Sequence, residues 1–108
     1  MLYHGYLGPV TLGDTIRLGI TAINGSLVAT TADSAPSWSI YLFNGGDDSE
    51  ILTGNLGAAA ADSKTGYHTG NAAITVGNGF AAGNVYRIRY STTISAAEIP
   101  HEAYFRVI

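Results

Sequence analysis

Apolar and polar residues alternate with a period of two over several short stretches of this chain. The clearest is 15–22, where the even-numbered positions are apolar and the odd-numbered ones are threonine, arginine or glycine. Because successive side chains of a strand point to opposite faces, this pattern predicts a half-buried β-strand. Asn24-Gly25 follows, and this pair suits the positive φ angles of a tight turn.

Further stretches show the same alternation and end in clusters of turn-forming residues. In 85–94 the pattern turns the even-numbered residues toward the core and leaves Arg87 and Arg89 outward. Tyr67 is out of phase with the apolar residues that follow it, which predicts a β-bulge near Gly70. Besides 15–22, the predicted strands are 38–43, 50–55, 67–76, 85–94 and 102–108, with 2–7 as a first edge strand before Gly8-Pro9.

About seven strands with no helical pattern between them indicate an all-β fold, an immunoglobulin-like two-sheet β-sandwich. We expect residues 1–108 to form a single domain of this type, with 1–8 as an edge strand or a contact arm. Trp38 in the third strand and Tyr86 in the penultimate one favour the sandwich, since such folds place a core tryptophan and a tyrosine corner there. A jelly roll or a small barrel needs a similar number of strands and stays open as an alternative.

Composition narrows the classes of partner. The 108 residues contain no cysteine, which excludes disulfides, thiolate metal sites and a cysteine nucleophile. Charged residues make up 12%, about half the usual share of roughly 25%, and the net charge of −3 argues against nucleic acid or an anionic membrane as partner. No apolar run is long enough to span a bilayer, and we expect no signal peptide. An uncharged polar surface is dehydrated at a lower cost in free energy than a charged one. The composition therefore favours a protein whose surface is covered by a partner.

The sequence contains no motif that points to catalysis. The histidines share no ligand spacing, and no GxSxG, GxGxxG or P-loop pattern occurs. We therefore predict no enzymatic activity, no cofactor and no metal site. We expect the three histidines to lie at the surface or half-buried, and they are His4, His68 and His101.

One acidic cluster follows two glycines, and it consists of Asp47, Asp48 and Glu50. Oxygen ligands at near-alternate positions can hold calcium in a loop, although the 12-residue spacing of an EF-hand is missing. A solvated turn between two strands explains the cluster with fewer assumptions. Both interpretations remain open on the sequence alone.

Candidate partner contacts come from the outward positions of the predicted strands. Arg87, Arg89 and Arg106 form a stripe if the last two strands pair. Such a stripe either docks an acidic partner surface or pairs with Glu98 or Glu102, and the local pairing is slightly favoured. Outward or terminal tyrosines either contribute to an interface or lie flat on the sheet. They are Tyr3, Tyr6, Tyr41 and Tyr104.

Five segments together carry a resemblance to a known group of proteins. They are Gly5–Gly8, Gly13–Leu18, Asp62–Tyr67, Asn78–Ile88 and Phe105–Ile108. This combination resembles the small immunoglobulin-like modules of tailed bacteriophages, found as capsid decoration (cement) proteins and as units of baseplates and fibres. The likeness extends over nearly the whole chain. Because the chain starts at Met1 and ends on a predicted strand, we expect a freestanding decoration protein rather than one domain of a fibre.

The resemblance implies a non-enzymatic virion protein on the outer surface of the capsid. Decoration proteins of this kind bind the major capsid protein, commonly as trimers, and reinforce the shell by bridging its subunits. The resemblance also leaves open a tail, baseplate or fibre module, either structural or attaching to host-surface glycan or protein. The residues expected to contact the capsid are Leu2, Tyr3, His4, Tyr6, Arg87, Arg89, Tyr104 and Arg106.

Overall fold

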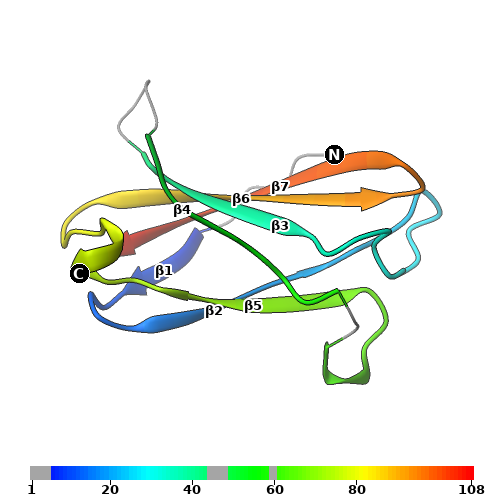
Figure 1. The fold of residues 1–108 in the computed structure, drawn as a ribbon, viewed down its shortest axis with the longest axis horizontal. Helices are drawn as coiled ribbons and strands as arrows, with labels where there is room; N and C mark the ends of the chain where they lie inside the picture. Colours follow the sequence, from blue (N-terminus) through cyan, green and yellow to red (C-terminus); the bar gives the residue numbers. More distant parts are fainter. Residues whose placement is uncertain (1–5, 44–48, 59–60) are drawn as a thin grey trace.

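The strands of the computed structural model form two sheets that pack face to face (Figure 1). The structure describes residues 6–43, 49–58 and 61–108. Within these residues, one sheet has five strands in the order β1-β7-β6-β3-β4, and the other pairs β2 with β5. The strands are β1 (Tyr6–Val10), β2 (Thr15–Thr21), β3 (Ser37–Leu42), β4 (Ser49–Asn55), β5 (Tyr67–Ala73), β6 (Val85–Ile94) and β7 (Ala97–Val107).

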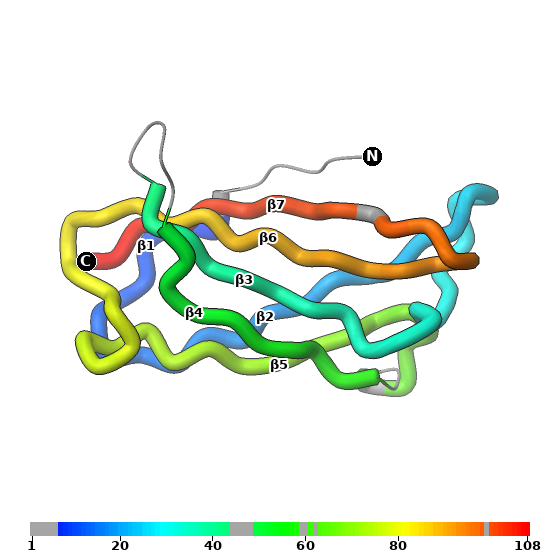
Figure 2. Tube along the Cα trace, turned by 45° about the horizontal axis from the view of Figure 1, so that its top comes forward, coloured from blue at the N-terminus to red at the C-terminus, as the bar shows by residue number. Residues whose placement is uncertain are grey.

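The structure confirms the predicted immunoglobulin-like two-sheet β-sandwich. β1 runs parallel to β7, and the other paired strands are antiparallel. Figure 2 shows β2 and β5 as a separate layer below β3, β6 and β7. Two single-turn 3₁₀ helices, η1 (Ala61–Ser63) and η2 (Val76–Asn78), lie in the connections before and after β5. None of the helices described in the structure is long and apolar enough to cross a membrane.

The core lies between the two sheets and follows the predicted phases. The even-numbered residues of β6, from Tyr86 to Ile94, are buried, whereas Arg87 and Arg89 are only half-buried. Phe105 of β7 is fully buried, and Arg106 beside it is exposed. Period-two alternation therefore predicted correctly which face of these two strands packs inward.

Two aromatic residues anchor the sandwich where the sequence predicted them. The hydroxyl of Tyr86 accepts a hydrogen bond of 2.9 Å from the backbone N–H of Ala81, which is the predicted tyrosine corner. The ring of Tyr86 also packs against Phe80, with 4.8 Å between the ring centres. Trp38 is buried against Gly54, where an added Cβ would lie 2.6 Å from a ring carbon of Trp38. Glycine at position 54 therefore makes room for the core tryptophan.

The first edge strand extends past the predicted end at residue 7. β1 (Tyr6–Val10) includes Gly8-Pro9, and 2–5 of the predicted strand lie outside the described part of the chain. Gly8 adopts a φ of 91°, and the pairing with β7 shifts register between Tyr6 and Pro9. Because proline cannot donate to a ladder, an edge strand is the place where a sheet tolerates it.

The predicted bulge near Gly70 is wrong. β5 pairs with β2 without a register shift, from Thr15–Ala73 to Thr21–Tyr67. The residue in phase with the apolar positions is His68, which is completely buried, so the expectation of an exposed or half-buried histidine is also wrong for this one. The apolar pattern is interrupted at this position because a polar residue, His68, lies in the core.

Two strands have bounds several residues away from those predicted, for local reasons. β5 ends at Ala73 instead of residue 76, because Thr75 caps η2 by accepting a hydrogen bond from the N–H of Asn78. β7 begins at Ala97 instead of residue 102, because the two-residue turn Ser95-Ala96 leads directly from β6 into β7.

Candidate partner-binding face

The outward face of the five-stranded sheet brings together residues that are far apart in the sequence. Strand register pairs Tyr41 of β3 with Arg87 of β6, and Arg87 with Tyr104 of β7. At the ends of this row, Glu50 of β4 lies opposite Tyr41, and the backbone of Tyr6 in β1 lies opposite Tyr104. Side chains of residues paired across a sheet share one face. We call Tyr41, Arg87 and Tyr104 the central row.

Aromatic contacts hold the side chains of the central row in place. The guanidinium carbon of Arg87 lies 4.7 Å from the centre of the Tyr41 ring, a cation–π contact. Phe43, which follows β3 and is exposed, packs edge-on against Tyr104 with 5.4 Å between the ring centres. Tyr41, Arg87 and Tyr104 are each half-buried. Their positions are thus restrained while part of each side chain faces solvent.

Glu102 forms ion pairs with two arginines of this face, Arg87 and Arg89. Its Oε1 accepts hydrogen bonds from Nη1 of Arg87 at 3.4 Å and Nη1 of Arg89 at 3.3 Å. The side chain of Glu102 is only 7% exposed, whereas that of Arg89 is 40% exposed. Two guanidinium groups around one carboxylate leave a single excess positive charge, and the pairing holds both arginines against the sheet.

β6 and β7 pair, which was the condition for the arginine stripe. The predicted local pairing with a glutamate is also present. Arg87 and Arg89 pair with Glu102, whereas Arg106 is exposed and lies opposite Val85. Docking of an acidic partner by the stripe stays a prediction. Leu2, Tyr3, His4 and the side chain of Tyr6 lie outside the part that the structure describes.

The candidate face also contains two residues, Tyr41 and Phe43, that the expected contact set missed. Tyr41 was recognised as outward but was not included in that set, and Phe43 shares its phase in 38–43. Their period-two alternation with Trp38 is the signal that identifies both. Glu50 is an exposed residue of β4, while Asp47 and Asp48 fall outside the described residues, so the calcium hypothesis stays untested. Within the described ranges, no group of three or more potential ligands could hold a metal ion.

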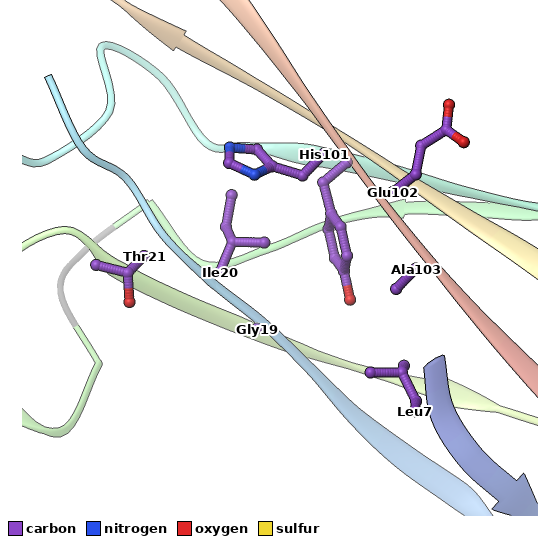
Figure 3. Close-up of a pocket in the computed structure, with 8 residues that line it drawn as sticks. Leu7, Gly19, Ile20, Thr21, His101, Glu102 and Ala103 are labelled. Atoms are coloured by element: carbon purple, nitrogen blue, oxygen red, sulfur yellow. The ribbon is translucent and has the colours of Figure 1, made fainter. Parts of the chain in front are cut away.

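A small pocket opens between the two sheets, along β2 and β7 (Figure 3). Its volume is about 240 Å³, below the range of roughly 300–1,000 Å³ typical of sites for drug-sized ligands. Leu7, Ile20 and Ala103 make its lining largely apolar, and the carboxylate of Glu102 points away from them. The pocket can therefore take one small apolar group.

The two ring systems in this pocket are uncharged at neutral pH. Burial raises the pKa of the Tyr90 phenol to about 12, against the opposite effect of a hydrogen bond with the Gly19 backbone. Burial also lowers the pKa of His101, because an imidazolium ion loses hydration there. Neither group carries a charge that would attract an ionic ligand.

Comparison with known proteins assigns no family to this chain. No model of a known protein family matches it, and no curated protein matches it either. The resemblance to phage modules therefore stays an expectation from the sequence segments quoted above.

Proposed function

We propose that this protein is a non-enzymatic structural protein of a bacteriophage virion, which binds the outer face of the capsid shell. The observation that carries the proposal is the restrained, partly exposed cluster of Tyr41, Phe43, Arg87 and Tyr104 on one sheet face. Tyrosine and arginine are, with tryptophan, enriched at the energetic centres of protein interfaces. The likeness to decoration proteins supports the capsid as the partner.

The mechanism we infer is that of a clamp. A rigid sandwich binds neighbouring copies of the major capsid protein, so each copy adds binding free energy that expansion of the shell must overcome. The shell repeats the same site many times, and self-association as a trimer would link several contacts in one molecule. The N-terminal residues Leu2, Tyr3, His4 and Tyr6 are proposed as further contacts.

Preorganisation supports this use of the sheet face. The rings of Tyr41 and Tyr104 have few rotatable bonds, and Glu102 already holds Arg87 and Arg89 in place. Less side-chain entropy is lost when such groups enter an interface.

The test is binding to shells prepared without this protein, measured by co-sedimentation. We expect Tyr104→Ala to weaken binding at least about tenfold, which corresponds to about 1.4 kcal/mol. Tyr67→Ala is the matched control, because Tyr67 is also a half-buried tyrosine but belongs to the two-stranded sheet. Equal binding by both variants would show that the central row does not contact the shell. Absence of wild-type binding would reject the capsid function itself.

The second candidate is a tail, baseplate or fibre module that attaches to host-surface glycan or protein. One observation favours it: a cavity of about 480 Å³ lined by Thr21, Ala29, Lys64, Thr65 and Tyr67. A Cβ at Gly19 would lie 3.2 Å from a ring carbon of Tyr67, so this ring lies against the strand. An aromatic ring beside hydroxyl and ammonium donors suits a sugar.

The copy number of the chain in purified virus particles separates the two candidates. Quantitative mass spectrometry against the major capsid protein measures it directly. Hundreds of copies support shell decoration, and a dozen or fewer support a tail location. Loss of glycan binding in Tyr67→Ala, with Tyr104→Ala unchanged, would support the attachment function. Absence from particles would reject both.

A further inference from the structure

The β2–β3 connection, at the right-hand end of Figure 1, contains an Asn-Gly pair in an ordered turn. Oδ1 of Asn24 accepts hydrogen bonds from the backbone N–H groups of Ser26 and Val28, at 2.9 and 3.1 Å. Because a backbone N–H can only donate, these two bonds distinguish the oxygen of the side-chain amide from its nitrogen, Nδ2. The N–H of Asn24 also donates to the carbonyl of Val28. The turn therefore holds the Asn24 side chain folded back against its own backbone.

The peptide nitrogen of Gly25 is open to reaction. Gly25 is exposed, and a Cβ built at this position would meet nothing within 4 Å. Among the described residues, neither the N–H of Gly25 nor Nδ2 of Asn24 has a hydrogen-bond partner. The positive φ expected at the Asn-Gly pair is found at Leu27 instead, where it is 61°. The turn thus does not require glycine at position 25 for its conformation.

Asn24 and Gly25 carry the two reactants of an amide cyclisation. The Gly25 nitrogen attacks Cγ of Asn24, a C–N bond forms, and Nδ2 leaves as ammonia with the proton that the Gly25 nitrogen gives up. Water then opens the resulting succinimide ring to aspartate or isoaspartate, and no oxidant or reductant is needed. Negative charge develops on Oδ1 in the tetrahedral intermediate. The two N–H groups that already bind Oδ1 stabilise this charge in the manner of an oxyanion hole.

A second Asn-Gly pair, Asn78-Gly79, has the opposite arrangement. Nδ2 of Asn78 donates to the carbonyl of Ala73 at 2.8 Å, and the N–H of Gly79 donates to the carbonyl of Val76 at 3.0 Å. Both nitrogens that react in the first pair are therefore held in hydrogen bonds in the second. The two asparagines are each half-buried, so exposure does not distinguish them. This pair is a built-in control for the effect of the turn.

We propose that Asn24 is a site of spontaneous deamidation in the folded protein, promoted by its turn and proceeding through a succinimide with the Gly25 nitrogen. The reaction replaces a neutral amide by a carboxylate, so the modified molecules gain a negative charge in the β2–β3 connection. Isoaspartate also routes the main chain through the former side chain, which lengthens the turn by a methylene group. The protein thus ages into several charge forms, whatever its partner is.

The test is peptide mapping by mass spectrometry while folded protein is incubated at mildly alkaline pH. We expect Asn24 to convert at least about tenfold faster than Asn78, with isoaspartate among the products. In urea-unfolded protein the two sites should convert at similar rates, because glycine follows both and the hydrogen bonds are gone. Asn44-Gly45, the third such pair of the sequence, lies outside the described residues and is mapped separately.

Gly25→Ala is the matched variant. Its methyl group crowds the attacking nitrogen, whereas the turn keeps its conformation because φ at this position is not left-handed. We expect the conversion of Asn24 to slow at least about tenfold, with the rate at Asn78 unchanged. The melting temperature should not fall, which shows that the turn is intact in the variant.

Each outcome decides the proposal. Conversion of Asn24 as slow as that of Asn78 in folded protein would overturn it. Equal rates in Gly25→Ala and wild type, or aspartate without isoaspartate, would also overturn it, because either result excludes the succinimide. A difference between the two sites that persists in urea would reject the turn as its cause. Fast conversion of Asn24 that requires both the folded state and Gly25 would support the proposal.

Discussion

The two ends of the sandwich reach left-handed backbone by different means. At the end that carries the β1–β2 and β5–β6 connections, Gly13, Gly79 and Gly83 supply the positive φ angles. A Cβ at Gly13 or Gly83 would meet nothing within 4 Å, so glycine there serves backbone conformation alone. At the other end, which carries the β2–β3, β4–β5 and β6–β7 connections and is called the loop end, Gly66 also has a positive φ, but Leu27 and Ala96 adopt this conformation against the preference of their side chains. The loop end thus carries Cβ atoms at positions where glycine would adopt the backbone conformation at a lower cost in free energy.

The ends also differ in what holds their connections. Tyr86 secures the β5–β6 connection through one hydroxyl and an aromatic cluster. The loop end depends on polar braces instead. Nδ1 of His68 lies 2.8 Å from the carbonyl of Gly57, and Nε2 accepts a hydrogen bond of 3.3 Å from the N–H of Ala32. Because the Ala32 N–H can only donate, the proton of the imidazole must lie on Nδ1.

The largest expected effect comes from removing the buried brace of the loop end. His68→Ala leaves the Ala32 N–H and the Gly57 carbonyl without partners and creates a cavity, so we expect a loss of about 4 kcal/mol in unfolding free energy. Urea denaturation measures it. His101→Ala is the control, because His101 is only half-buried, and we expect it to lose less than half as much. Equal losses would show that His68 is not a brace.

Sequence alone predicted those parts of the fold that local alternation determines. The outward positions of Tyr104 and Arg106, the buried face of β6 and the tyrosine corner at Tyr86 all follow from phase and turn chemistry. These features depend on residues close together in the chain. They need no knowledge of strand order.

Features that depend on distant pairs could not be predicted in the same way. His68 is in phase with Ala72 and Ile74, but the groups that satisfy its buried imidazole lie 11 and 36 residues away, so the sequence alone did not show that a histidine could occupy this core position. Glu102 is buried because two arginines of the neighbouring strand surround one of its oxygens. The central row exists only once β3, β6 and β7 are known to be adjacent. Sequence therefore identified most members of the candidate site but not their arrangement.

A smaller effect is expected at the opposite end, where one hydroxyl is the anchor. Tyr86→Phe keeps the ring in the aromatic cluster but removes the acceptor of the Ala81 N–H, so we expect a loss of about 1–2 kcal/mol in unfolding free energy. Tyr41→Phe is the control, since Tyr41 is half-buried on the outward face, and we expect a change below about 0.5 kcal/mol. Chemical denaturation of both variants tests this. If Tyr86→Phe is as stable as the wild type, the hydroxyl of Tyr86 does not stabilise its end of the sandwich as His68 stabilises the loop end.

The smallest effects compare the two ends directly through reciprocal substitutions. Ala96→Gly relieves a left-handed alanine at the loop end, and we expect a gain of about 0.5 kcal/mol after the added chain entropy of glycine is subtracted. Gly83→Ala introduces the same conformation at an open position of the other end and should lose about 1 kcal/mol. Thermal and urea unfolding of the two variants measure both. If both variants lose unfolding free energy, the turn at Ser95-Ala96 is not strained. Its geometry would then be stabilised by the hydrogen bonds from its two N–H groups to the carboxylate of Asp33.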